Sequence, residues 1–97
     1  MGQKAEETLD ISFDEFSNYL RAHTRIFMDV EGGSYYLTHT DGYWRAQDCA
    51  VMNDKGHFTD CSDLVPTLSE FLGLTWLDGK KIEDVFDEST SYKSIQD

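Results

Sequence analysis

The chain has 97 residues, which leaves room for one hydrophobic core and makes residues 1–97 a single domain. Its 19 acidic and 8 basic side chains give a formal net charge of -11, so direct binding to nucleic acid or to an anionic membrane is disfavoured. The hydrophobic fraction of 39% is too high for a disordered segment, and the sequence contains no apolar run of membrane-spanning length and no export signal. We expect a folded cytoplasmic protein.

The first expected element is a helix from Ser12 to about Ala22. Ser12 and Glu15 have the spacing of a capping box, in which each side chain accepts a hydrogen bond from the backbone amide of the other residue. Apolar and aromatic residues then follow at helical spacing and predict a buried stripe, with Tyr19 beside it: Phe13, Phe16, Leu20 and His23. Residues 1–10, which are polar and aperiodic, are expected to form a loose leader.

Residues 25–47 change to a period of two and predict an antiparallel meander. Gly32-Gly33 and Asp41-Gly42 suit two-residue hairpin turns, because a type I′ turn needs positive φ at both central positions. A turn at Gly32-Gly33 places Val30 opposite Tyr35. The face expected to receive the first helix carries Ile26, Met28, Val30, Tyr35, Leu37, His39, Trp44 and Ala46. The opposite face mixes aromatic and polar groups: Phe27, Asp29, Tyr36, Thr38, Tyr43, Arg45 and Gln47.

A third hairpin is expected around residues 53–56, which combine turn-forming residues with a glycine. If the preceding strand has no bulge, Met52 faces Phe58 on the core side and Cys49 faces Cys61. The two cysteines are then candidates for a disulfide in an oxidising environment, and for ordinary reduced side chains otherwise.

The last third of the chain returns to helical spacing. A helix capped by Ser62 or Asp63 should end at Gly73, and after a turn at Asp78-Gly79 residues 80–86 predict a short last helix, with a hairpin as the alternative. Residues 89–97 are expected to be a loose tail. The predicted fold is α+β: an N-terminal helix packed on an antiparallel meander of about four strands, followed by two short helices.

The leading functional hypothesis is a small acidic module, non-enzymatic, that binds or inhibits another protein or pairs with a second copy as a homodimer. Its expected interface is the mixed face, since aromatic residues and arginine are enriched where proteins meet: Phe27, Asp29, Tyr36, Tyr43 and Arg45. The pattern leaves open whether the C-terminal helices cover this face.

Two alternatives remain. The first is a small-molecule pocket or modest enzyme around Tyr35, His39, Trp44 and Asp48, in which His39 and Asp48 act as an acid/base pair; ordinary buried side chains compete with this interpretation. The second is an acidic mimic of nucleic acid that blocks a basic groove. Cys49, His57 and Cys61 lack a C-x-x-C pair and a fourth ligand, so neither a metal nor a cofactor is expected.

Overall fold

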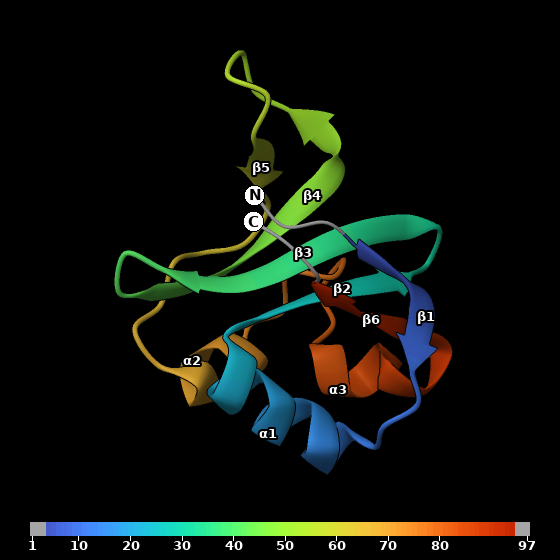
Figure 1. The fold of residues 1–97 in the computed structure, drawn as a ribbon. Helices are drawn as coiled ribbons and strands as arrows, with labels where there is room; N and C mark the ends of the chain where they lie inside the picture. The colour runs from blue at the N-terminus through green and yellow to red at the C-terminus, as the bar shows by residue number, and fades with distance from the viewer. Residues whose placement is uncertain (1–3, 95–97) are drawn as a thin grey trace.

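The computed structural model describes residues 4–94 as an α+β fold with one six-stranded antiparallel sheet in the order β1-β6-β2-β3-β4-β5 (Figure 1). The elements in chain order are β1 (Lys4–Leu9), α1 (Phe13–His23), β2 (Arg25–Val30), β3 (Gly33–Thr40), β4 (Tyr43–Met52), β5 (Phe58–Asp60), α2 (Leu68–Leu72), α3 (Ile82–Val85), the 3-10 helix η1 (Phe86–Glu88) and β6 (Thr90–Ser94). Among these residues no helix has the length and apolar character needed to cross a membrane.

The sheet has two more strands than the sequence pattern predicts, and both come from the chain ends. β1 and β6, expected to be loose, pair with each other, and β6 also pairs with β2. In that second pairing Phe27 lies opposite Tyr92 and Met28 opposite Ser91. Polar residues can form strands here because the neighbouring strands satisfy their backbone groups, so little side-chain burial is needed.

Helix α1 begins as predicted at a capping box. The Ser12 amide donates to Glu15 Oε1 at 2.9 Å, and the Glu15 amide donates to Ser12 Oγ at 3.2 Å. The helix buries Phe16 and Leu20 against the sheet. His23, which was expected on the buried stripe, is exposed instead, and its ring lies 4.3 Å from that of Tyr19.

Replacing Ser12 with alanine is expected to lower the free energy of unfolding by about 1 kcal/mol, because the Glu15 amide loses its acceptor. The hydrogen bond from the Ser12 amide, followed by that from its hydroxyl, lowers the pKa of Glu15. The ionised box is therefore present above the ordinary glutamate range and is lost as pH falls through the lowered pKa. Urea unfolding at neutral and acidic pH measures both effects, and an unchanged midpoint at neutral pH would contradict the cap.

The first hairpin turn lies one residue earlier than expected, at Glu31-Gly32 instead of Gly32-Gly33. Glu31 and Gly32 have φ values of 53° and 81°, the positive pair that a type I′ turn requires. Val30 therefore lies opposite Gly33, not Tyr35. Each partner changes by two positions, and because side chains alternate with a period of two, the faces of the strands stay as predicted.

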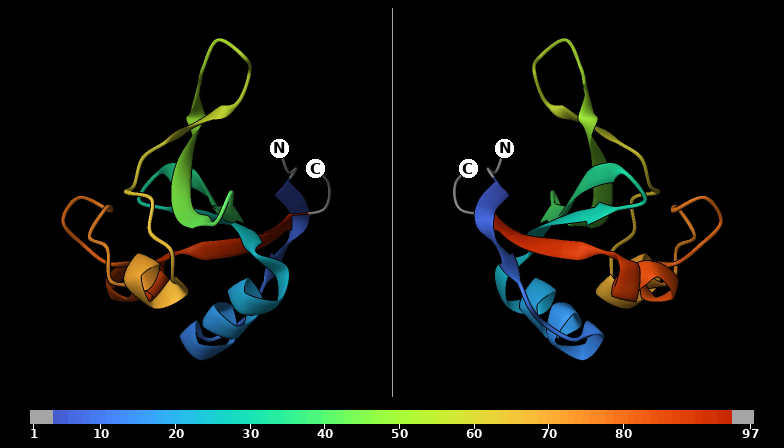
Figure 2. Two further views of the ribbon diagram at one scale, coloured as in Figure 1. Left: turned by 90° about the vertical axis from the view of Figure 1, so that its left-hand side faces the viewer. Right: turned by 90° about the vertical axis from the view of Figure 1, so that its right-hand side faces the viewer.

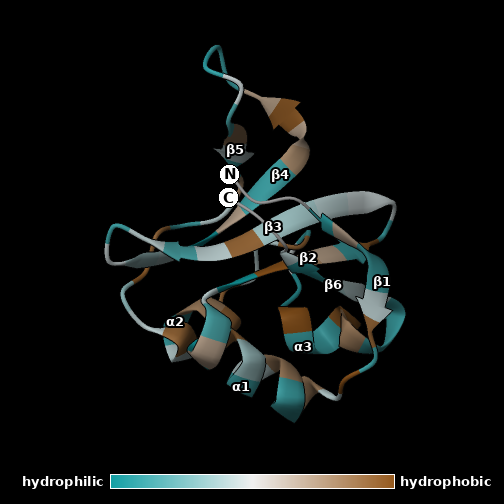
Figure 3. Cartoon of the chain, in the orientation of Figure 1, coloured by the Kyte–Doolittle hydropathy of each residue, from teal (hydrophilic) through white to brown (hydrophobic). Residues whose placement is uncertain are grey.

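The second turn, Asp41-Gly42, is confirmed, with φ values of 55° and 87° and with His39 opposite Trp44. Beneath the helices, the strands contribute Ile26, Met28, Val30, Leu37, Trp44 and Ala46 to one hydrophobic core. The helices contribute Phe16, Leu20, Leu68, Phe71, Ile82 and Val85. Figure 3 shows the ribbon coloured by hydropathy, with apolar bands on the helices and strands that enclose this core.

Helix α2 is shorter than predicted and is capped by Thr67, not by Ser62 or Asp63. The preceding chain is held extended because Val65 bridges Trp44: the Trp44 amide donates to the Val65 carbonyl at 2.7 Å, and the Val65 amide donates back at 3.1 Å. The end of α2 at Gly73 is confirmed. The turn at Asp78-Gly79 and the short helix α3 after it are also as predicted.

The third hairpin forms an arm that projects away from the helices in both views of Figure 2. Its turn is confirmed, because the Asn53 amide donates to the His57 carbonyl and Met52 lies opposite Phe58. However, the register between β4 and β5 shifts between Asp48 and Met52, where no bulge was expected. Across this interval β4 has three more residues than β5, and a shift by an odd number of residues exchanges the faces of the side chains beyond it.

Candidate functional site

The mixed face of the sheet is not covered by any helix of the described chain, since α1, α2 and α3 all pack on the other face (Figure 2). The arm instead curls over the mixed face and brings Phe58 onto it. The Phe27 and Tyr36 rings lie 4.6 Å apart, and Phe58 lies 6.3 Å from Phe27 and 5.9 Å from Tyr36. Phe27 and Tyr36 are only 3% and 6% exposed. The expected open aromatic patch is thus replaced by a small second core.

The other residues expected in the interface lie on β2 and β4, on either side of β3. Asp29 accepts hydrogen bonds from Lys4 Nζ at 2.9 Å and from Ser34 Oγ at 2.7 Å, beside β1. Tyr43, which is 44% exposed, and Arg45 lie near the Asp41-Gly42 turn. The buried Phe27 and Tyr36 lie between Asp29 and the pair Tyr43 and Arg45, so the five residues do not form one exposed surface.

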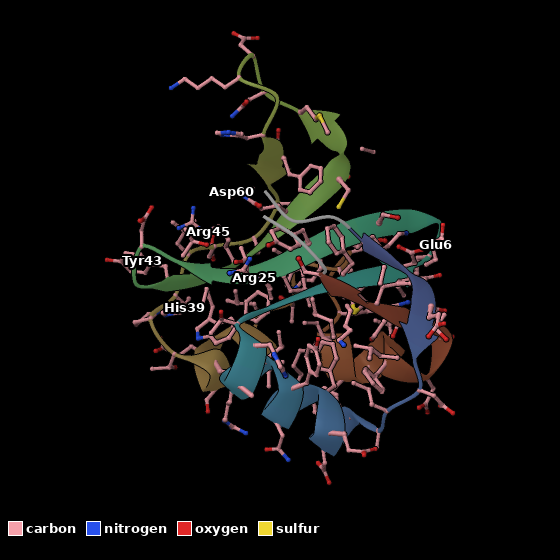
Figure 4. The ribbon with its side chains drawn as sticks, viewed as in Figure 1. Glu6, Arg25, His39, Tyr43, Arg45 and Asp60 are labelled. Atoms are coloured by element: carbon pink, nitrogen blue, oxygen red, sulfur yellow. The ribbon has the colours of Figure 1, made fainter. Side chains whose placement is uncertain are left out.

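A cleft of about 510 Å³ opens on the mixed face beside Tyr36 and Arg45. We name it the open-face cleft; its lining residues are Arg25, Tyr36, Thr38, His39, Thr40, Asp41, Arg45, Gln47, His57 and Phe58. It contains two of the three arginines of the chain and two of its three histidines. Figure 4 shows Arg25, Arg45 and His39 in one part of the molecule, with Glu6 on the far side. A strongly acidic protein thus gathers Arg25, Arg45 and His57 around one hollow, whereas the His39 ring packs near Trp44 on the other face of the sheet.

Arg45 is fixed against one wall of the open-face cleft. Its Nη2 donates to the Thr40 carbonyl at 3.0 Å, and its Nη1 lies 3.5 Å from Asp60 Oδ2. Asp60 Oδ1 in turn accepts a hydrogen bond of 2.9 Å from Gln47 Nε2. The Nε–H of Arg45 is buried and has no acceptor among residues 4–94. The arginine therefore retains donor capacity at a cleft wall.

Sequence reasoning identified Tyr36, Tyr43 and Arg45 but did not group Arg25, His57 and Phe58 with them. His57 and Phe58 reach the cleft only because of the shifted register in the arm, and a local pattern carries little information about such a shift. The available signal was the placement of Met52 opposite Phe58, which predicted the hairpin but not its face.

The four residues of the alternative pocket form two cross-strand pairs that do not converge on one site. Tyr35 lies opposite Asp48, and His39 lies opposite Trp44 with its ring 5.0 Å away. Asp48 and Trp44 are four positions apart on β4, which corresponds to roughly 13 Å along a strand. The buried pair Leu37 and Ala46 lies between them. This spacing does not fit the proposed acid/base pair of His39 and Asp48.

Tyr35 and Asp48 have local partners instead. The Tyr35 ring meets Trp76 edge-on at 5.0 Å, and the Asp48 carboxylate accepts from the Ala50 amide at 2.9 Å. Burial raises the pKa of Tyr35, and the nearby charge of Asp48 raises it further. These contacts match the structural interpretation, in which both side chains are satisfied parts of the packing.

Cys49 and Cys61 are not cross-strand neighbours, which corrects the predicted pairing. The Cys61 amide donates to the carbonyl of Ala46, three residues before Cys49. Three strand residues span roughly 10 Å, whereas disulfide-bonded residues have Cα atoms closer than about 7 Å. Both thiols are free, and within residues 4–94 they do not gather with His57 into a metal-binding cluster.

Oxidation of the monomer is expected to give no intramolecular disulfide. Desolvation raises the pKa of both thiols from 9.0 to about 11, and Cys49 is the less exposed of the two, so its reactive thiolate should be at least about tenfold rarer than in the unfolded chain near pH 8. Iodoacetamide labelling with and without urea measures this ratio. The same shift means that stability declines as pH rises from 9 to 11, where only the unfolded thiols ionise. Rapid formation of an intramolecular bridge would show that the register of the arm is wrong.

Two acidic residues from distant parts of the sequence, Asp10 and Asp87, lie beside the β1–β6 pair. Asp10 and Asp87 line one shallow cleft there, together with Thr8 and Thr90. Because β1 and β6 are adjacent, residues far apart in sequence form one acidic region.

The chain matches no protein-family model, no curated protein and no solved structure.

Proposed function

We propose that this protein is a non-enzymatic binding module that engages a partner protein through the open-face cleft. The observation that carries the proposal is a hollow with a basic lining on the sheet face that no described helix covers. The exposed Tyr43 lies near this cleft, and tyrosine and arginine are the side chains that most often anchor protein interfaces. The separation of His39 from Asp48 weakens the enzymatic alternative.

The charge of the molecule supports a directional encounter with the partner. At -11 the protein attracts basic surfaces, and such attraction accelerates association. The cleft is the region in which basic side chains are concentrated. A partner with a basic rim around an acidic projection would complement both features.

A homodimer through the mixed face has less support, since Phe27 and Tyr36 are already buried within one chain. A sheet face joins two copies when it offers contiguous apolar area. The Phe58 side chain occupies this area instead.

The test is to fill the cleft with one large side chain. Thr40 is exposed and lines the cleft, so Thr40→Trp should occlude it while leaving the Thr40 carbonyl available to Arg45. Thr59→Trp is the matched control, since Thr59 is also an exposed strand threonine but does not line the cleft. Tagged proteins are incubated with native-host extract, and the bound proteins are quantified by mass spectrometry.

We expect one saturable partner to be captured equally by the wild type and by Thr59→Trp, and at least tenfold less by Thr40→Trp. Equal unfolding midpoints of the two variants would establish that the loss is local. Capture by Thr40→Trp at the wild-type level, or no specific capture by any of the proteins, would contradict the proposal.

The acidic nucleic-acid mimic is the second candidate, and the convergence of Asp10 and Asp87 favours it. In this case the captured protein should itself bind nucleic acid through a basic groove. Capture should then survive Thr40→Trp and decline when Asp10 and Asp87 are changed to asparagine. The same assay therefore separates the two candidates.

A further inference from the structure

We infer that the open-face cleft recognises a carboxylate from an aspartate or glutamate side chain of the partner, with Arg45 as the main hydrogen-bond donor. In the free protein, the carboxylate of Asp60 pairs with Arg45 instead. The inference rests on the proposed function and specifies its chemistry. It is carried by the contacts that Arg45 and Gln47, two lining residues of the cleft, make with the carboxylate of Asp60 beside it.

Arg45 has the capacity for a further ligand. A guanidinium has five N–H donors, and the hydrogen bond to the Thr40 carbonyl uses one of them. Nη1 is 3.5 Å from Asp60 Oδ2, a distance at which the ion pair lacks a close hydrogen bond. The buried Nε–H is without an acceptor among residues 4–94, and such a group is costly to leave unsatisfied. A carboxylate is the acceptor that matches a guanidinium in charge and in planar geometry.

Asp60 shows how Arg45 and Gln47 together hold a carboxylate. One of its oxygens accepts from Gln47 Nε2 at 2.9 Å while the other lies near Arg45. Arg45 and Gln47 are two positions apart on β4 and therefore point to the same face, so a guanidinium and an amide donor act on one carboxylate. An incoming carboxylate would find the same pair of donors.

Asp60 is also placed so that it can be displaced. It is the last residue of β5, a three-residue strand at the edge of the sheet, and its side chain is 38% exposed. An exposed ion pair of this kind contributes little, because water and salt screen it. The side chain can rotate away without breaking the strand pairing, since the pairing depends on backbone groups.

The basic lining explains why an anion can enter a protein whose net charge is -11. Arg25 and His57 border the same cleft as Arg45, with Asp41 as the acidic residue of the lining. A singly charged carboxylate meets less long-range repulsion from the rest of the molecule than a doubly charged phosphate does. The electrostatics thus favour a carboxylate over a phosphate.

The direct test is an NMR titration of the labelled protein with N-acetyl-glutamate amide, in which the side chain supplies one carboxylate. N-acetyl-glutamine amide is the uncharged control, and inorganic phosphate is the competing anion. We expect the glutamate probe to shift the amides of residues 38–47 and 57–60 in a saturable way. Equal binding of the glutamine probe, or tighter binding of phosphate, would overturn the carboxylate assignment.

Two substitutions should change the affinity in opposite directions. Asp60→Asn is nearly isosteric and removes the internal competitor, so binding of the glutamate probe should become at least threefold tighter. Arg45→Gln should weaken it at least tenfold, whereas Arg21→Gln on the exposed surface of α1 should leave it unchanged. Arg45→Lys keeps the charge but loses the planar fork, so its affinity for the glutamate probe should lie between those of the wild type and Arg45→Gln.

If Arg45→Gln fails to fold, Asp60→Asn and Arg45→Lys decide the question, and weaker or unchanged binding by Asp60→Asn overturns the inference. The outcome is also distinct from that of the proposed function. If Thr40→Trp loses partner capture but the wild type does not respond to the glutamate probe, the carboxylate inference is wrong and the proposed interface stands. If the probe binds saturably but Thr40→Trp does not affect partner capture, the cleft is not the protein interface.

Discussion

Replacing Tyr36 with glutamate is expected to destabilise the fold by about 3 kcal/mol or more. Tyr36 is 6% exposed, and its ring contacts Phe27 and Phe58 on the mixed face. The substitution removes an aromatic ring from this second core and places a charge in it. The free energy of unfolding, from urea titration followed by circular dichroism, gives the size of the effect.

Tyr43→Glu is the matched control, since Tyr43 projects from the same face but is 44% exposed. It should change stability by no more than about 0.5 kcal/mol. Tyr36→Ala removes the ring without adding a charge and is expected to cost about 2 kcal/mol. If Tyr36→Glu were as stable as the wild type and converted a dimer into a monomer, the mixed face would be an open interface and the second core would not exist.

Local sequence signals predicted the elements whose formation depends on nearby residues. The Ser12 and Glu15 box is satisfied by atoms three residues apart, so it could be identified without knowing the fold. The Asp41-Gly42 turn is likewise set by two residues that accept positive φ. At Glu31-Gly32 the prediction failed by one residue because two adjacent glycines offer two positions for the turn, yet the faces were preserved.

The strands at the chain ends could not be predicted in this way. β6 lies between β1 and β2, so its pairing depends on residues more than sixty positions away in sequence. Its residues are mostly polar, and the buried Ser91 gives no hydrophobic alternation. Such a strand is stabilised by backbone hydrogen bonds to its neighbours, which leave little trace in side-chain pattern.

The candidate site was only partly predictable for a related reason. Arg45 and Tyr36 follow from the alternation of two regular strands. Phe58 joins them because the register of β4 and β5 shifts after Asp48. This irregularity of three residues moves an aromatic ring from the expected core face to the mixed face, where Phe58 packs on Tyr36 and lines the cleft.

The main core beneath the helices should respond strongly to the loss of Phe16. Phe16→Ala is expected to lower the free energy of unfolding by about 4 kcal/mol, the upper range for deleting a fully buried aromatic side chain. Phe16 is 0% exposed, and its ring centroid lies 6.1 Å from that of Phe13 and 5.1 Å from that of Phe86. It thus joins α1 to η1 as well as to the sheet, and the cavity left by its removal cannot be filled by one neighbour moving alone.

Phe13→Ala provides the comparison, because Phe13 belongs to the same aromatic group but is only partly buried. Its loss should cost about half as much, since less area returns to water and solvent can fill the gap. Because a domain of this size is stable by only about 5 to 15 kcal/mol, Phe16→Ala should bring the protein close to unfolding at 37 °C while Phe13→Ala remains folded. Urea titration of both variants at 15 °C gives the two values. Equal, small losses in the free energy of unfolding would mean that α1 lies loosely on the sheet. A loss for Phe16→Ala well above that for Phe13→Ala would establish Phe16 as the residue through which the N-terminal helix and the C-terminal segment stabilise each other.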